Sequence, residues 1–432
     1  MESNQLRRAG WLILAFAVPG SAQLRAGQRL VGGVAVVVWA ALWILVGVVV
    51  VGTSLAPTTG FALIASSSTL AVARTVAICL GVFWLAVGLH TALIIVRRPA
   101  RRSFSGSAAL IAALVPALIA ALLSAGLPLA AASVLSAAER TEAELFVPSP
   151  DVVLANGRLN ILLLGTDAGP DRAGRRTDSI SVASIDVVTG RVALVGVPRE
   201  LEQVPLPPGS PLLAESPSGV YDCGNDCQLG FLYQRVEEFS PELYPDSSSR
   251  HSSPGVEAVR DAVEGALGLS IPYYLQVDML GFSALIDELG GVDLTVAERL
   301  PIDGDENGVG VSGYIEPGRQ HLDGTTALWY ARSRQSTSDY DRMSRQRQLE
   351  QVLLAGQNPA ELGLAFARVI DRDPSLVRTD LTEGAFAQLL ALASAARSTP
   401  VSTAELTPPA VDPKNPDYTA VRRLVAATLV GG

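Results

Sequence analysis

The chain has 432 residues, of which 49% are hydrophobic and 17% are charged, and its formal net charge at pH 7 is −9. This length and apolar content suit a membrane portion followed by one large domain. The negative net charge argues against nonspecific binding to nucleic acid. The three histidines are scattered along the chain, and the sequence contains no Cys/His cluster of the kind that binds a metal.

Three long apolar segments predict an α-helical membrane region over residues 1–135. Residues 30–51, 75–96 and 108–134 are each long enough to cross a bilayer, since about 20 apolar residues span its hydrocarbon core. We expect this region to act as an anchor. Transport is the alternative, and its one indication is His90 inside the second span.

A shorter apolar segment, residues 9–22, could be re-entrant, interfacial or a short span. It could also belong to a signal peptide, because Arg7 and Arg8 precede it. Between the second and third long spans lies a cluster of four arginines: Arg97, Arg98, Arg101 and Arg102. The positive-inside rule places such a cluster in the cytoplasm, so everything after residue 134 is predicted to lie outside.

We therefore expect a multi-pass protein of the cell membrane whose C-terminal domain is extracytoplasmic. In such an oxidising compartment, the pair Cys223 and Cys227 in the sequence CGNDC predicts a small-loop disulfide. In the cytosol the same spacing would instead have indicated redox or metal chemistry.

Residues 136–158 are predicted to be a linker, because an acidic, helix-prone stretch is followed there by Pro148 and Pro150. Residues 159–432 are predicted to form the folded domain. Strands are expected at 160–164, 179–185, 191–197, 273–277 and 292–296, and helices at 256–267 and 279–289. Strands that alternate with helices indicate a layered α/β domain.

The segment 160–200 contains the first candidate site residues. Asp167 lies just past the end of the first strand, and the runs 179–185 and 191–197 read as a β-hairpin with a five-residue connection. In that hairpin Asp178 and Arg199 flank the open end together. Two carboxylates and a guanidinium that converge at one edge suit a divalent cation that holds a phosphate.

The segment 318–354 is rich in arginine. Asp323 is expected to cap one helix and Asp339 the next. On the second helix, Arg345 shares a face with Arg342 and Gln346. Guanidinium groups bind phosphate oxygens through two parallel hydrogen bonds, so this block predicts phosphate binding. The alternative is an ordinary solvated basic face. The candidate phosphate ligands are Arg332, Arg334, Arg342 and Gln346.

Other motifs carry little weight. The glycines of residues 308–313 match a dinucleotide-binding pattern, but neither a strand before them nor a helix after them is predicted. Asp303 and Asp305 match the start of a calcium-binding loop, yet Tyr314 stands where its closing glutamate should be. The chain contains neither a GxSxG nor a GxxxxGK[ST] motif, which leaves a serine hydrolase or P-loop enzyme without support.

Taken in order, six segments resemble the LytR–CpsA–Psr family of cell-wall glycopolymer ligases across residues 159–354. They are NILLLGTD (160–167), RTDS (176–179), VPRE (197–200), LGGVDL (289–294), HLDGTTALWYARSR (321–334) and DYDRMSRQRQ (339–348). The chain departs from the family in its three predicted long spans, where many members have one. It also has Glu200 where aspartate is frequent.

The resemblance implies a phosphotransferase. It would move a glycopolymer from a polyprenyl diphosphate carrier to a hydroxyl of peptidoglycan, leaving a phosphodiester, with membrane lipid as a further partner and no nucleic acid. The implied fold is a three-layer α-β-α domain with a mixed central sheet. Family members also have a hydrophobic tunnel for the lipid tail, whose residues the sequence does not identify here.

The resemblance also assigns roles to the candidate residues. Asp167 and Asp178 would hold Mg²⁺ (or Mn²⁺). The diphosphate would be gripped and surrounded by Arg176, Arg199, Arg332, Arg334, Arg342 and Gln346. Two other functions stay open: a non-catalytic, membrane-anchored wall or regulatory binding protein, and a polyprenyl diphosphate hydrolase that uses the same residues with water as acceptor. The intact set of acids and arginines favours the ligase over the binding protein.

Overall fold

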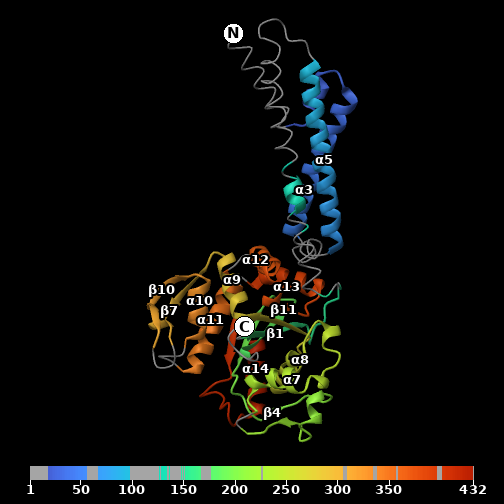
Figure 1. Ribbon diagram of the computed structural model, residues 1–432. Coiled ribbons are helices and arrows are strands. Elements are labelled where there is room, and N and C mark those ends of the chain that lie inside the picture. The colour runs from blue at the N-terminus through green and yellow to red at the C-terminus, as the bar shows by residue number, and fades with distance from the viewer. Residues whose placement is uncertain are drawn as a thin grey trace. The chain divides into compact units, whose positions relative to one another are not determined.

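Figure 1 shows the computed structural model of the protein, which forms two compact units, Met1–Arg140 and Thr141–Gly432. The structure describes residues 18–55, 67–97, 126, 128–133, 136, 147, 149, 151–166, 177–224, 227–304, 309–333, 338–356, 359–396 and 401–431.

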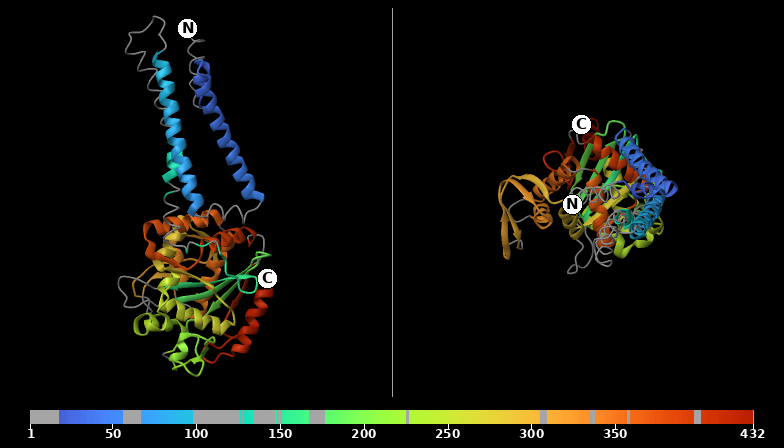
Figure 2. Two further views of the ribbon diagram at one scale, coloured as in Figure 1. Left: turned by 90° about the vertical axis from the view of Figure 1, so that its right-hand side faces the viewer. Right: turned by 90° about the horizontal axis from the view of Figure 1, so that it is seen from above.

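The N-terminal unit contains the helices α2 (Ser21–Arg25), α3 (Arg29–Leu55) and α5 (Ser67–Arg97) (Figure 2). Within the described residues, one helical segment, Thr69–Thr91, is long and apolar enough to cross a membrane, and Arg29–Leu45 is a shorter apolar stretch. The predicted segments 9–22 and 108–134 lie largely outside the described residues. The multi-pass topology therefore stays a prediction.

A six-stranded mixed sheet forms the centre of the C-terminal unit, in the order β11-β6-β1-β2-β3-β12. The pairs β1/β6 and β3/β12 are parallel, and the other neighbours are antiparallel. This confirms the predicted α/β class with a mixed sheet. The strands are β1 (Arg158–Thr166), β2 (Thr177–Asp186), β3 (Val192–Val197), β6 (Tyr273–Asp278), β11 (Val377–Thr379) and β12 (Ser402–Glu405).

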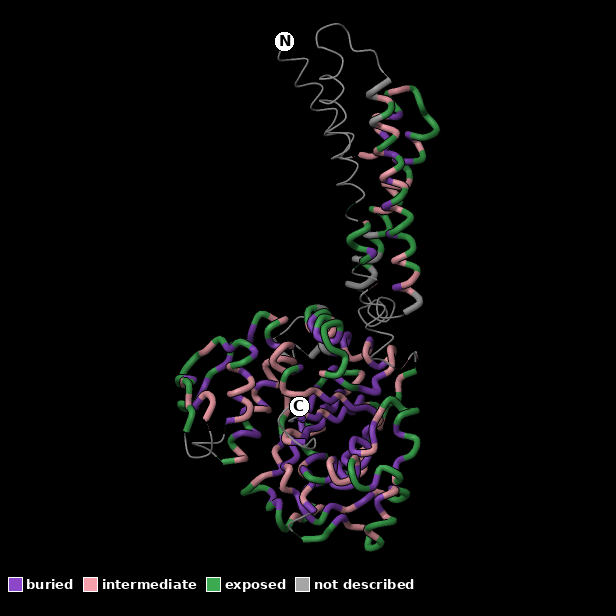
Figure 3. The backbone as a smooth tube through the Cα atoms, in the orientation of Figure 1, coloured by how far each residue is buried: buried purple, intermediate pink, exposed green. Residues whose placement is uncertain are grey.

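Helices cover both faces of this sheet, because successive side chains of a strand point to opposite sides. Leu162 and Leu164 of β1 belong to one buried core, whereas Leu159 and Ile161 belong to another. Figure 3 shows the buried residues concentrated around the sheet. The first core is covered by α7 (Leu229–Phe239), α8 (Pro254–Leu267) and α14 (Tyr418–Val430), and the second by α9 (Met279–Glu288), α12 (Pro359–Arg372) and α13 (Glu383–Ala396).

A third core includes Ile286 of α9 together with residues of the elements that follow, among them Leu294 and Tyr330. Two antiparallel strand pairs, β7/β10 and β8/β9, surround it together with two helices. These elements are β7 (Val292–Val296), β8 (Leu300–Asp303), β9 (Val311–Ile315), β10 (Gly318–Leu322), α10 (Gly324–Arg332) and α11 (Asp339–Gly356). The remaining short elements are β4 (Val204–Pro205), β5 (Val220–Tyr221) and the 3₁₀ turns Pro211–Ala214, Pro241–Leu243, Ser248–Arg250 and Pro374–Leu376.

The hairpin of β2 and β3 has the predicted connection. The Asp186 carboxylate accepts hydrogen bonds from the backbone of Val188 and Thr189 at 3.0 and 2.8 Å, and Gly190 takes a left-handed conformation with φ of 71°. Ile180 pairs with Val197 at the other end. This register brings the ends of β2 and β3 to the same edge of the sheet, as the sequence predicts.

The start of α11 differs from the prediction by one residue. Ser338, not Asp339, caps this helix: its hydroxyl accepts from the backbone N–H of Asp341 at 3.2 Å, and the Asp341 carboxylate accepts from the N–H of Ser338 at 2.8 Å. This reciprocal arrangement is a capping box. Asp339 is thus inside the first turn. The cap of α10 is confirmed, because Asp323 accepts from the N–H of Thr326 at 2.8 Å.

Gly324 allows α10 to approach α9 closely. Its N–H donates to the Asp287 carboxylate at 2.7 Å, and a Cβ at this position would collide with the backbone oxygen of Ser283. We expect Gly324→Ala to lower the free energy of unfolding by about 1–3 kcal/mol, as overpacking does in other cores. Thermal and denaturant unfolding of the purified chain measures this.

Gly363→Ala is the matched control, since a Cβ there meets only side-chain carbons of Leu390 and Phe386 at 3.6 Å or more. Alanine favours a helix over glycine by about 1 kcal/mol, so this variant should be equally or slightly more stable. Equal stability of the Gly324→Ala variant and the wild type would contradict the proposed close packing.

Candidate functional site

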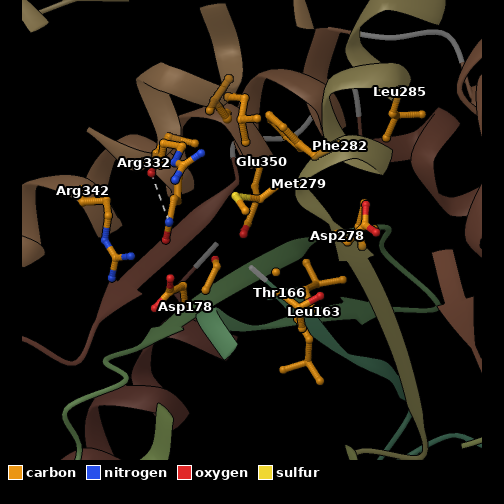
Figure 4. A pocket seen from close by; sticks show the side chains of 18 of the residues that line it. Leu163, Thr166, Asp178, Asp278, Met279, Phe282, Leu285, Arg332, Arg342 and Glu350 are labelled. Carbon is orange, nitrogen blue, oxygen red and sulfur yellow. Dashed lines mark hydrogen bonds between the residues drawn. The ribbon is translucent and has the colours of Figure 1, made fainter. Parts of the chain in front are cut away.

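A cavity of about 820 Å³ lies where β1 and β6 end and β2 begins, between the sheet and helices α9, α10, α11 and α12. Figure 4 shows Asp178, Arg332 and Arg342 toward one side of it, and Phe282 and Leu285 toward the other. Its volume is typical of a site for a small or medium-sized ligand. The cavity thus has a charged end and a largely apolar wall.

The structure brings five of the predicted site residues to this cavity. Asp178 comes from β2, Arg199 follows β3, Arg332 ends α10, and Arg342 and Gln346 come from α11. Elements far apart in the sequence therefore supply one set of charges.

The other three predicted residues, Asp167, Arg176 and Arg334, lie outside the described residues. Two of their described neighbours in the chain, Thr166 and Ser333, line the cavity.

Arg199 forms an ion pair with each of two carboxylates. Its Nη1 lies 2.7 Å from Asp178 Oδ1, and its Nε lies 3.6 Å from Asp339 Oδ2. Burial by itself lowers the pKa of Arg199, but the carboxylates of Asp339 and Asp178 outweigh burial, and the pKa is raised above its ordinary value. The guanidinium is therefore a fixed positive charge in this site.

Asp339 also holds Arg342, a role that the sequence reading missed. Arg342 Nη2 donates to Asp339 Oδ2 at 2.9 Å, and the Arg342 residue is only 2% exposed. Asp178, Arg199, Asp339 and Arg342 thus form a row of alternating charges. The spacing of three residues between Asp339 and Arg342 on one helix was the available signal for this contact.

Arg345 and Gln346 of α11 fasten the C-terminal end of α10. Arg345 donates from Nε to the carbonyl of Tyr330 at 2.9 Å and from Nη2 to that of Ser333, and Gln346 Nε2 donates to the carbonyl of Ala331 at 3.2 Å. The last carbonyls of a helix have no partner within it, so these bonds satisfy groups that would otherwise be unpaired. Arg345 is therefore structural, and the end of α10 that bears Arg332 is fixed.

Arg347 is also structural. It bonds Glu350 and, through Nε at 2.8 Å, Glu405 of β12, while Glu350 accepts from the Ser181 hydroxyl at 3.0 Å. Burial raises the pKa of Glu405. This network ties α11 to β2 and β12 and places one paired carboxylate, that of Glu350, in the cavity wall. Arg319 lies exposed on β10 and is not among the lining residues.

The apolar wall was missed by sequence reasoning. Its side chains come from two strands and four helices, and their spacing does not differ from that of ordinary core residues. Sequence pattern alone therefore could not separate them from the core. They are Leu163, Leu275, Val277, Met279, Phe282, Leu285, Leu328, Leu349, Leu353 and Phe366.

Cys223 and Cys227 lie at disulfide distance, with their Cα atoms 5.1 Å apart. Arg235 Nη1 lies 3.6 and 3.5 Å from their sulfur atoms. The pair is not among the residues that line the cavity. Its contribution is thus local to the segment before α7.

Removal of the Asp339 charge should disturb the row of charges. Asp339→Asn leaves the buried guanidinium of Arg342 without its carboxylate, and we expect a loss of about 3 kcal/mol in the free energy of unfolding, as is typical when one partner of a buried pair is removed. Asp341→Asn is the control, because Asp341 is exposed and the side-chain oxygen of asparagine can still accept the hydrogen bond from the N–H of Ser338. Equal denaturation midpoints for the two variants would show that the Asp339–Arg342 pair contributes no stability.

Comparison with known proteins shows the family of this chain. The LytR–CpsA–Psr family model matches residues 130–426. The cell wall biosynthesis protein LcpA of Corynebacterium glutamicum is 29% identical over 245 residues, which is 50% of this chain and 44% of that protein. The polyisoprenyl-teichoic acid–peptidoglycan teichoic acid transferase TagU of Bacillus cereus is 26% identical over 228 residues, 52% of this chain and 61% of that protein.

The chain spans about half the length of the curated relatives it matches. Among solved structures, B. subtilis TagV aligns with a TM-score of 0.45 and 22% identity, over 64% of this chain and 97% of that one. TagT bound to LIIa-WTA aligns with a TM-score of 0.41 and 17% identity, over 65% and 94%. The family model covers well over half of the chain, and the protein therefore belongs to the LytR–CpsA–Psr family.

Proposed function

We propose that this protein is a membrane-anchored phosphotransferase of cell-wall assembly. It transfers a glycopolymer from a polyprenyl diphosphate carrier to a hydroxyl of peptidoglycan and leaves a phosphodiester link. The observation that carries this proposal is one cavity with both a charged end that contains three arginines and an apolar wall. The names of two relatives, a cell wall biosynthesis protein and a teichoic acid transferase, support the same substrate class.

The shape of the cavity fits a lipid diphosphate. Withdrawal of an isoprenoid chain from a bilayer costs roughly 0.8 kcal/mol for each CH₂ group, so the protein must offer apolar surface in return. The wall between α9, α11 and the sheet provides such surface, with Phe282, Leu285 and Leu353 among its residues. A soluble sugar phosphate has no apolar chain to bury against this wall.

The charged end suits the transfer step. The oxygen of the acceptor hydroxyl attacks the phosphorus next to the glycopolymer, and the hydroxyl proton is released to water. The bond from this phosphorus to the bridging oxygen breaks, and polyprenyl phosphate leaves with those electrons. Phosphoryl transfer depends mainly on positioning and charge neutralisation. Arg199 and Arg342 are held in place by carboxylates before substrate arrives, and Arg332 lies at the fastened end of α10.

A divalent metal is part of the proposal. No group of three or more potential metal-binding side chains occurs among the described residues. Mg²⁺ needs only one or two carboxylates beside substrate phosphates and waters, so Asp178 together with Asp167 is a sufficient donor set. When bound, Mg²⁺ would neutralise charge on the diphosphate oxygens.

We further propose that the catalytic domain lies outside the cell and is anchored by several spans. The long apolar helices α3 and α5 and the arginine cluster at residues 97–102 support this topology. The cysteine pair at disulfide distance suits an oxidising compartment.

The decisive test uses the full chain in lipid nanodiscs with a polyprenyl diphosphate glycan, MgCl₂ and a peptidoglycan fragment. Mass spectrometry should detect a joined phosphodiester product. Asp178→Ala and Arg332→Ala should each reduce its rate by about 10²–10³-fold, the loss typical when one group that stabilises transition-state charge is removed. Arg319→Ala, from the same arginine-rich block but exposed on β10, should retain the wild-type rate.

Each other result points to another function. Free glycan phosphate without a joined product would indicate a hydrolase. Binding of the lipid diphosphate without turnover on any acceptor would indicate a binding protein. Full activity after chelation with EDTA would remove the metal from the proposal and leave the transfer reaction in place.

A further inference from the structure

Trp329 stands at the junction between the charged end of the cavity and its apolar wall. Both Trp329 and Arg332 line the cavity, one helical turn apart on α10. The guanidinium carbon of Arg332 lies 4.8 Å from the centroid of the Trp329 ring. This distance is within the range of a cation–π contact, for which tryptophan is the best aromatic partner.

The ring is itself held by the protein. Trp329 is partly buried and packs against the third core, as do Phe282 and Leu353 of the cavity wall. Its carbonyl accepts from the N–H of Ser333 at 2.9 Å, at the helix end that α11 fastens. One side chain thus shares the third core with two residues of the apolar wall and lies against the Arg332 guanidinium.

We infer that Trp329 is a positioning residue that holds the Arg332 guanidinium toward a diphosphate. Binding of the diphosphate thereby depends on the adjoining apolar wall. The inference rests on the proposed function and names a residue to which that function assigns no role. Arginine has many rotamers, and ordering such a side chain opposes binding unless it is ordered beforehand. A stack on a fixed ring provides that order.

Binding of small probes can test this without turnover. The probes are inorganic pyrophosphate, geranyl diphosphate and geraniol, titrated by calorimetry into the full chain in nanodiscs. Trp329→Leu keeps an apolar side chain but removes the aromatic face. It should lower the affinity for pyrophosphate and for geranyl diphosphate by about tenfold. Trp329→Phe should recover most of this loss. Phe282→Leu, a wall aromatic, should weaken geranyl diphosphate but not pyrophosphate.

A double-mutant cycle separates positioning from a general packing defect. In an Arg332→Gln background, Trp329→Leu should change pyrophosphate affinity less than twofold. Trp329 is the sole tryptophan of residues 141–432, so replacement of Trp11, Trp39, Trp43 and Trp84 by phenylalanine gives a chain whose fluorescence reports on this ring. Pyrophosphate should shift that fluorescence, and Arg332→Gln should abolish the shift.

Wild-type pyrophosphate affinity in Trp329→Leu, or an equal loss in the Arg332→Gln background, would overturn the inference while the proposed function stands. Failure of the wild type to bind either diphosphate would overturn the proposed function and the inference together.

Discussion

The row of alternating charges formed by Asp178, Arg199, Asp339 and Arg342 determines how the site is built. Each guanidinium lies next to a carboxylate, so cations that a diphosphate would need can be partly buried before any ligand is present. The row also joins the β2–β3 hairpin to α11, which links the central sheet to the elements of the third core.

The arginine-rich block shows how one composition can serve two purposes. Arg345 and Arg347 bond carbonyls and carboxylates of the protein itself, whereas Arg332 and Arg342 line the cavity. The structural pair fixes α11 against α10, β2 and β12, and the lining pair is held on those elements. The arginines that line the cavity are thus held on elements that other arginines fix.

Much of the fold was predictable, because alternation and turn residues mark β2, β3 and their connection, and because capping residues mark the start of α10. Asp178 and Arg199 were predictable as neighbours once the hairpin was assigned. The apolar wall was not, since Leu163 or Phe366 cannot be told from core residues until helices and sheet are placed in three dimensions. Asp339 was misread because one residue decides whether an acid caps a helix or faces a site.

The edges of the central sheet come from the last part of the chain. β11 and β12 flank strands that are made more than a hundred residues earlier, and Glu405 of β12 is a partner of Arg347. A ribosome makes β1, β2 and β3 first, so β3 has an unpaired edge until residues beyond 402 have been synthesised, and unpaired edges invite wrong pairing. The nascent domain therefore has to be shielded from aggregation for most of its synthesis, and its central sheet is complete only at the end.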